Sequence, residues 1–228
     1  FLDAGYSLLE DASKSAMKRK PEGWSIVLAG FWNRSILLPD WVLPQFFPKH
    51  AAQDQRVNLE VPLLPTQPII YKDPNVVMEA SETKVVIRPL NLALETRNRC
   101  VDIANSLLEA LPRTRITAVG VNVGFREEPI TPSTAALLAD SADHPLDKLG
   151  WKVIGRRKSR KLKRDDDTLF LTLTLDESWV DFDFNFHTDT AGLQAADSKV
   201  MSAIARDRLT RVRKDATRVM LDVYGLIP

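Results

Sequence analysis

Apolar and polar side chains alternate most strictly in the stretch WVDFDFNFHTD, residues 179–189. Phe182, Phe184 and Phe186 share one side of an extended chain, because successive side chains of a strand point to opposite faces. The other side carries Asp181, Asp183, Asn185 and His187. The pattern predicts a strand that buries its phenylalanines, and it leaves open whether the polar row is a solvated face or a functional site.

Less regular runs predict further strands and their turns. Residues 24–33 are apolar at almost every position, which is typical of a strand buried on both faces. Seven prolines between Pro39 and Pro74 predict short or edge strands there, because proline cannot donate to a strand ladder. The segment Asp73-Pro74-Asn75 predicts a turn. The further predicted strands are residues 24–33, 57–64, 67–71, 75–80, 83–90, 115–125, 151–164 and 168–175.

Two stretches have the three- and four-residue spacing of amphipathic helices. The first runs from Leu94 to Leu111 before Pro112, and the second runs from about Ala195 to Gly225. Both are long enough to cover one face of a sheet. The shorter predicted helices are one capped by Asp3, one at residues 40–43 that ends at Pro44 or Pro48, and one from Ser133.

The order of these elements predicts an α+β fold with two halves. Each half runs strand, helix, several antiparallel strands and a long helix, so we infer a pseudo-duplication in which each half packs its sheet on its long helix. No repeat at the level of individual residues accompanies this order. The predicted organisation is an N-terminal helical arm at 1–21, a first sheet-plus-helix half at 22–112 and a second at 113–228.

The phrases LAGFWNRSILLPDWV and ITAVGVNVGF, taken with this element order, resemble a set of bacterial proteins of unknown function with two sheet-plus-helix halves. The resemblance covers residues 24–224, carries no catalytic motif and implies a bacterial origin. The topology is also similar, by analogy, to the paired repeats of TATA-box-binding proteins, whose saddle-shaped sheet contacts DNA. That analogy concerns the fold and does not extend to function.

Charge and cysteine content remove several classes of function. The 31 Lys and Arg residues against 30 Asp and Glu give a net charge of +1, so no field of the whole molecule draws it to nucleic acid or an anionic membrane. The single cysteine, Cys100, excludes an intrachain disulfide framework and fits a reducing cytoplasm. We expect a buried, inert thiol at Cys100, a cytoplasmic location and no membrane partner, since the longest apolar run is far shorter than about 20 residues.

Charge becomes informative in one segment, residues 152–164. It holds eight cations and no acid, and Asp165, Asp166 and Asp167 follow at once. Such a hairpin is able to grip phosphates, although the segment contains no aromatic side chain on which bases stack. The alternatives are a solvated strand face and acids that fold back on the cations. The candidate nucleic-acid-binding residues are Arg156, Arg157, Lys158, Arg160, Lys161, Lys163 and Arg164.

The candidate metal ligands are Asp181, Asp183 and His187. Alternate side chains on a strand lie roughly 7 Å apart, so the two carboxylates are able to share a hard cation such as Mg²⁺, with His187 or Asp189 as general base. The competing interpretation is the wet face of an antiparallel sheet. On the neighbouring predicted strand, Gly120 and Gly124 form a face where a backbone or a ligand can approach closely.

Neither a nucleophile elbow nor a glycine-rich phosphate loop occurs in the sequence. This favours a non-enzymatic binding or assembly protein that acts through a surface, without a cofactor, on another protein or on a second copy of itself. The alternatives are a nucleic-acid-binding module that uses the hairpin at 152–164 and a metal-dependent enzyme centred on Asp181 and Asp183. The aromatic residues Trp24, Trp32, Trp41, Phe46 and Phe47 are either core or a partner groove.

Overall fold

The protein is an α+β molecule built on one antiparallel sheet, which confirms the predicted fold class. The computed structural model describes residues 17–47, 57–62, 64, 66–141 and 143–226. The strands are β1 (Lys18–Arg19), β2 (Ser25–Gly30), β3 (Asn58–Glu60), β4 (Ile69–Lys72), β5 (Val76–Ala80), β6 (Lys84–Pro89), β7 (Arg115–Glu127), β8 (Arg156–Arg164), β9 (Asp167–Leu175) and β10 (Val180–Gln194).

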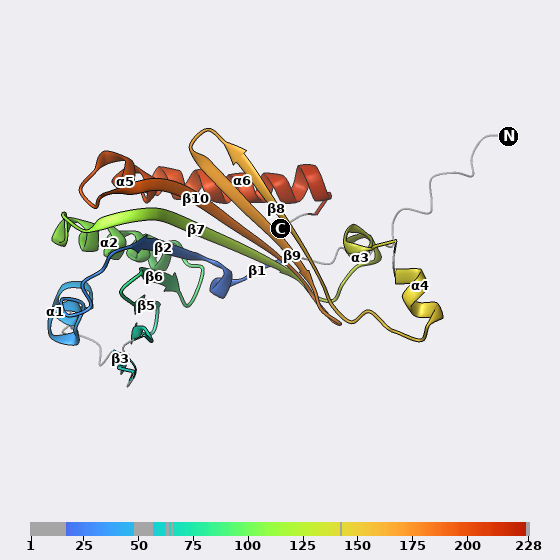
Figure 1. The fold of residues 1–228 in the computed structure, drawn as a ribbon, viewed down its shortest axis with the longest axis horizontal. Helices are drawn as coiled ribbons and strands as arrows, with labels where there is room; N and C mark the ends of the chain where they lie inside the picture. Colours follow the sequence, from blue (N-terminus) through green and yellow to red (C-terminus); the bar gives the residue numbers. More distant parts are fainter. Residues whose placement is uncertain (1–16, 48–56, 63, 65, 142, 227–228) are drawn as a thin grey trace.

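The strands lie in the order β3-β4-β5-β6-β2-β7-β10-β9-β8, and β1 pairs separately with β7. Strands β7 and β10 form the long centre of the sheet (Figure 1). In their register Phe182 lies opposite Phe125 and Phe184 opposite Val123. Pairing of β2 with β7 joins strands from the two predicted halves in one sheet. Next to β2 lies β6, the last strand of the first predicted half, and next to β7 lies β10, the last strand of the second. Internal duplication itself stays a prediction.

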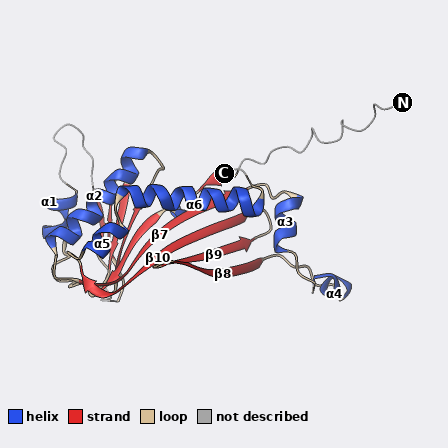
Figure 2. Ribbon diagram, turned by 90° about the horizontal axis from the view of Figure 1, so that it is seen from above, coloured by secondary structure: helices blue, strands red, loops and turns tan. Residues whose placement is uncertain are grey.

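Helices cover one face of this sheet. Figure 2 shows α6 lying along the strands, with α2 and α5 at the same face. An ion pair between Arg206 and Asp102 links α6 to α2. Within the described part of the chain, no helix has the length and apolar content that crossing a bilayer requires. The helices are α1 (Pro39–Phe46), α2 (Leu94–Ala110), α3 (Pro132–Leu138), α4 (Asp143–Lys148), α5 (Ser198–Ala203) and α6 (Arg206–Tyr224), with a 3-10 turn η1 (Pro21–Gly23).

The three alternating phenylalanines of β10 are buried under α6, as the sequence pattern predicts. Phe184 packs edge to face on Phe125, with ring centroids 5.9 Å apart. Phe182 packs in the same way on Tyr224 of α6, at 5.5 Å. This row is the centre of the core in the second half of the chain, and it places the residues between the phenylalanines on the opposite face.

The predicted turn at Asp73 is confirmed, and of the two interpretations of the aromatic cluster the core is the one that four of its five members follow, with Trp41 partly buried. The Asp73 carboxylate accepts hydrogen bonds of 2.7 Å from the backbone N–H groups of Asn75 and Val76, which closes the predicted turn between β4 and β5. The backbone N–H of Asp176 donates to the Trp179 carbonyl at 2.9 Å and closes the β9–β10 hairpin. The aromatic residues buried in the core are Trp24, Trp32, Phe46 and Phe47.

Several elements differ from their predictions. Strand β2 is buried on one face only, with Val27 and Ala29 partly exposed, because helices cover a single side of the sheet. Helix α1 contains Pro44 instead of ending there, since in a helix of eight residues a proline removes only one backbone hydrogen bond. The last helical stretch is two helices, separated by the extended backbone of Ala205 (ψ 146°). The predicted helix after Asp3 and the residue Pro48 lie outside the described residues.

Candidate binding face of the sheet

The sheet face opposite α2, α5 and α6 is the candidate functional surface, and we call it the open face. Its side chains form rows across neighbouring strands, since the register pairs Lys161 with Phe170, and Phe170 with Asn185. On β7 to β10 the open face includes Asn122, Arg126, Arg157, Ser159, Lys161, Lys163, Thr168, Phe170, Thr172, Thr174, Asp181, Asp183, Asn185, His187 and Asp189.

Asp181 lies at one end of the open face and is held by two cations. Arg126 donates from Nε to Oδ1 at 2.8 Å and from Nη2 to Oδ2 at 2.9 Å, and Lys20 Nζ contacts Oδ2 as well. Burial alone raises the pKa of Asp181, but these hydrogen bonds outweigh it and leave the pKa below its usual range. Asp181 therefore fastens the chain before η1 to β7 and β10.

Asp183 has a different environment, although it is the next side chain on the same face. It is half exposed, and its Oδ1 lies 3.8 Å from Lys20 Nζ. Burial raises the pKa of Asp183, and the more distant Lys20 only partly offsets it. Beside Asp183, the backbone at Gly23 approaches Gly124 closely, as predicted for the glycine face. A Cβ added to Gly124 would lie only 2.8 Å from the Cα of Gly23.

The candidate metal ligands therefore do not share one environment. Asp181 is engaged by Lys20 and Arg126, and His187 packs on the ring of Phe170. Within the described part of the chain, no group of three or more His, Cys, Asp and Glu side chains is arranged to hold a metal ion. The arrangement gives Asp181 an ion-pairing role, and the metal-dependent enzyme stays an alternative prediction without geometric support.

The two carboxylates make a matched pair for mutation. Asp181→Asn is expected to lower the free energy of unfolding at pH 7 by about 1–3 kcal/mol, because charge-assisted hydrogen bonds to a buried group are lost. Asp183→Asn is expected to raise stability at pH 7, because its carboxylate is less favourable in the folded state than in the unfolded chain. Urea unfolding of both variants and the parent checks these opposite signs.

The pH dependence of the two stability changes follows from the pKa shifts of Asp181 and Asp183. The stabilisation by Asp181, whose pKa is lowered, is present above about pH 4 and is lost as the pH falls through the folded-state pKa. The penalty at Asp183, whose pKa is raised, is present above its folded-state pKa and vanishes below about pH 4. Both differences from the parent should therefore shrink in acid. Equal signs for the two variants at pH 7 would contradict this assignment.

The cations of β8 divide between the two faces of the sheet. Those at even positions point to the helix side, and each contacts a structural partner there. Arg160 Nη1 donates to the Tyr224 hydroxyl at 2.7 Å, and Arg164 pairs with Asp215 of α6. Together with Arg156 and Lys158, these two arginines hold the edge strand β8 to α3, α4 and α6. The remaining partners are Asp143 and the Leu138 carbonyl for Arg156, and the Leu137 and Ala139 carbonyls for Lys158.

The cations at odd positions belong to the open face. Arg157, Lys161 and Lys163 are all exposed. Lys161 Nζ lies 5.5 Å from the centre of the Phe170 ring, and that ring meets His187 edge to face at 6.0 Å. Phe170 is 39% exposed, so the basic strand does have an aromatic neighbour on the adjacent strand. In the sequence, Phe170 alternates with Thr168 and Thr172, and this alternation indicates that its ring lies on the polar face of the strand.

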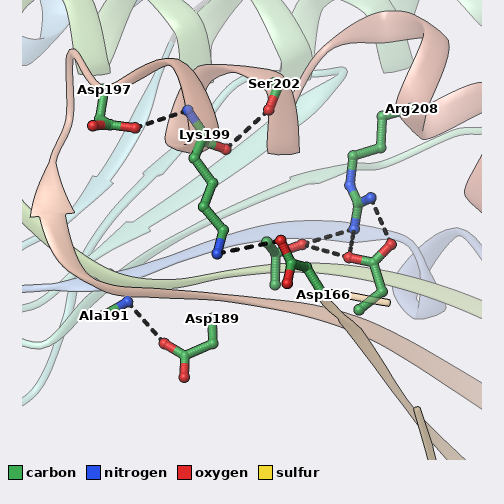
Figure 3. Close-up of polar contacts among 9 residues, drawn as sticks. Asp166, Asp189, Ala191, Asp197, Lys199, Ser202 and Arg208 are labelled. Carbon is green, nitrogen blue, oxygen red and sulfur yellow. Dashed lines mark hydrogen bonds and ion pairs between the residues drawn. The ribbon is translucent and has the colours of Figure 1, made fainter. Parts of the chain in front are cut away.

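Two of the three acids after the basic segment form ion pairs with the helices. Arg208 of α6 donates to both carboxylate oxygens of Asp167, at 2.8 and 2.7 Å, and Thr188 donates to Asp167 at 3.0 Å. Lys199 of α5 lies 3.6 Å from Asp166 (Figure 3). The hydrogen bonds from Arg208 and Thr188 outweigh the effect of burial and lower the pKa of Asp167. This cluster fixes the β8–β9 turn to the helix layer.

The predicted burial of Cys100 is also confirmed. Cys100 is fully buried in α2, and burial raises the pKa of its thiol to about 12. Because the thiolate is the reactive form, both the burial and the raised pKa disfavour reaction of Cys100 in the folded protein.

Comparison with known proteins gives no further assignment: no family model matches the chain, and no curated protein matches it. The resemblance to bacterial proteins with two sheet-plus-helix halves stays a prediction.

Proposed function

We propose that this chain is a non-enzymatic binding or assembly protein that acts through the open face of its sheet. The observation that carries the proposal is the asymmetry of the sheet. One face is buried under α2, α5 and α6, while the other presents an exposed aromatic ring, exposed cations and hydroxyl and amide groups in register. Surfaces of this kind, with aromatic and basic side chains together, are typical of recognition sites.

The proposed partner is a macromolecule and not a small substrate. The open face is extended over several strands, and its groups are spread along rows instead of converging on one point. Small-molecule sites are concave and converge on a few polar groups. Another protein or a second copy of the chain fits this description, and so does nucleic acid. A bacterial origin and a cytoplasmic location stay predictions that accompany the proposal.

Site-specific photocrosslinking in cells tests this function and does not require that the partner be identified first. The photoreactive residue p-benzoylphenylalanine is placed at Asn185 on the open face and, as a matched control, at Arg218, whose side chain on α6 is 80% exposed. We expect irradiation to give a discrete adduct from position 185 and not from position 218. Treating the adduct with nuclease or with protease identifies the class of partner. Equal or absent adducts at the two positions would overturn the proposal.

A further inference from the structure

We infer that the partner of the open face is single-stranded nucleic acid, bound at the end of the face formed by Lys161, Lys163, Phe170 and His187. This inference rests on the proposed function, and it names the partner class. Three observations carry it: the division of the β8 cations between two faces, the exposed ring beside them, and the lack of an ion pair at Lys161 and Lys163 among the described residues.

The first observation concerns the phosphates. Lys161 and Lys163 are exposed neighbours on one face of an edge strand, so their ammonium groups follow the strand at a spacing of roughly 7 Å. Arg157 lies further along the same row of β8. A line of cations beside an open surface fits a polyanionic backbone that runs along β8, and each phosphate neutralised releases bound counterions.

The second observation concerns the bases. Phe170 lies one strand inward from Lys161, and His187 lies one strand further on. The Phe170 ring is 39% exposed, and the Lys161 ammonium lies over it at 5.5 Å from the ring centre. When Lys161 turns outward to a phosphate, this face of the ring becomes available to a base. A phosphate bound by Lys161 would place its base over this ring. Stacking on an aromatic side chain is available to every base, so the expected sequence preference is small.

The third observation concerns competing charge. Two of the three acids after the basic segment are held on the helix side, Asp166 by Lys199 and Asp167 by Arg208. Asp181 is held by Lys20 and Arg126 at the other end of the open face. Asp183 lies at that same end, 3.8 Å from Lys20, and Asp189, beyond His187, accepts a hydrogen bond from the Ala191 N–H. Among the described residues, neither Lys161 nor Lys163 forms an ion pair, so their positive charge is left for an external anion. A single strand engages the cations and Phe170 with one repeating unit, a phosphate and its base, whereas bases paired in a duplex are not available to stack on the ring.

The test is fluorescence anisotropy of labelled 12-nucleotide DNA and RNA single strands and the corresponding DNA duplex, at salt concentrations from 20 to 200 mM. The matched variants are Lys161→Ala with Lys163→Ala, and Arg160→Ala with Arg164→Ala. Both pairs remove two charges from β8, but from opposite faces. The open-face pair is expected to weaken single-strand binding at least about tenfold and to flatten the slope of log K against log salt by about 1.4, two charges at about 0.7 each.

The control pair is expected to change affinity less than about twofold. Phe170→Ala is expected to weaken binding at least about fivefold without changing the salt slope, because it removes stacking and no charge. Thermal unfolding of each variant checks that the fold persists. The DNA and RNA arms show which sugar is preferred. Duplex binding as tight as single-strand binding, or equal losses in the two charge pairs, would overturn the inference.

The inference and the proposed function fail in different ways. If no oligonucleotide binds at 20 mM salt while the adduct at position 185 still forms and resists nuclease, the partner is a protein. In that outcome the nucleic-acid inference is wrong and the proposed function stands. If the adduct is absent as well, both are wrong.

Discussion

Replacing Phe184 with alanine should lower the free energy of unfolding by about 3–5 kcal/mol. The side chain is 1% exposed and packs edge to face on Phe125 and stacked on Phe186, so its removal leaves a cavity at the centre of the sheet–helix interface. A loss of this size is a large share of the stability of an ordinary domain. Urea or thermal unfolding of the variant measures it directly.

The matched control is Phe170→Ala on the neighbouring strand. This ring is 39% exposed and contacts Lys161 and His187. We expect a loss below about 1 kcal/mol, since surface substitutions rarely exceed this range. Similar losses for Phe184→Ala and Phe170→Ala would mean that both faces of the sheet are covered, and the open face would not exist.

The second large effect is expected at Arg208, which joins α6 to the β8–β9 turn. Arg208→Met should cost about 2–4 kcal/mol, because it strands the partly buried carboxylate of Asp167 and leaves Thr188 without its donor. The value is below that of a fully buried pair because the Asp167 side chain is 22% exposed. Adding Asp167→Asn to this variant removes the stranded charge and should recover more than half of the loss.

A surface ion pair between the helices provides the comparison. Arg206→Ala breaks the pair with Asp102, and both side chains are more than half exposed. Solvent screens such a pair, so the expected loss is below about 1 kcal/mol. If Arg206→Ala and Arg208→Met had equal effects, the β8–β9 turn would not be anchored through Asp167.

Local pattern was sufficient for much of the fold. The alternation around Phe184 identified β10, its covered face and its polar row, because the two-residue period of a strand is independent of its neighbours. The turn at Asp73 and the helix from Leu94 followed from equally local chemistry. These elements needed no information about which strands lie side by side.

Pairing and contact between distant residues were beyond the sequence pattern. The burial of β2 depended on whether a second layer covered Val27, and its apolar composition was the same either way. The basic segment looked uniform, but its cations divide according to the register of β8 on β9. Asp181 looked like a free ligand, and its two partners are Lys20, 161 residues away, and Arg126, 55 residues away.

Thiol labelling of the native protein tests the central claim, the availability of the open face, most directly. The native Cys100 is buried and serves as a silent background. Thr172→Cys places a thiol on the open face, and Leu171→Cys places one on the covered face of the same strand. We predict that the thiol at 172 reacts with a disulfide reagent at least about a hundredfold faster than the thiol at 171, which needs unfolding to react. Equal rates, or a protected thiol at position 172, would contradict the account.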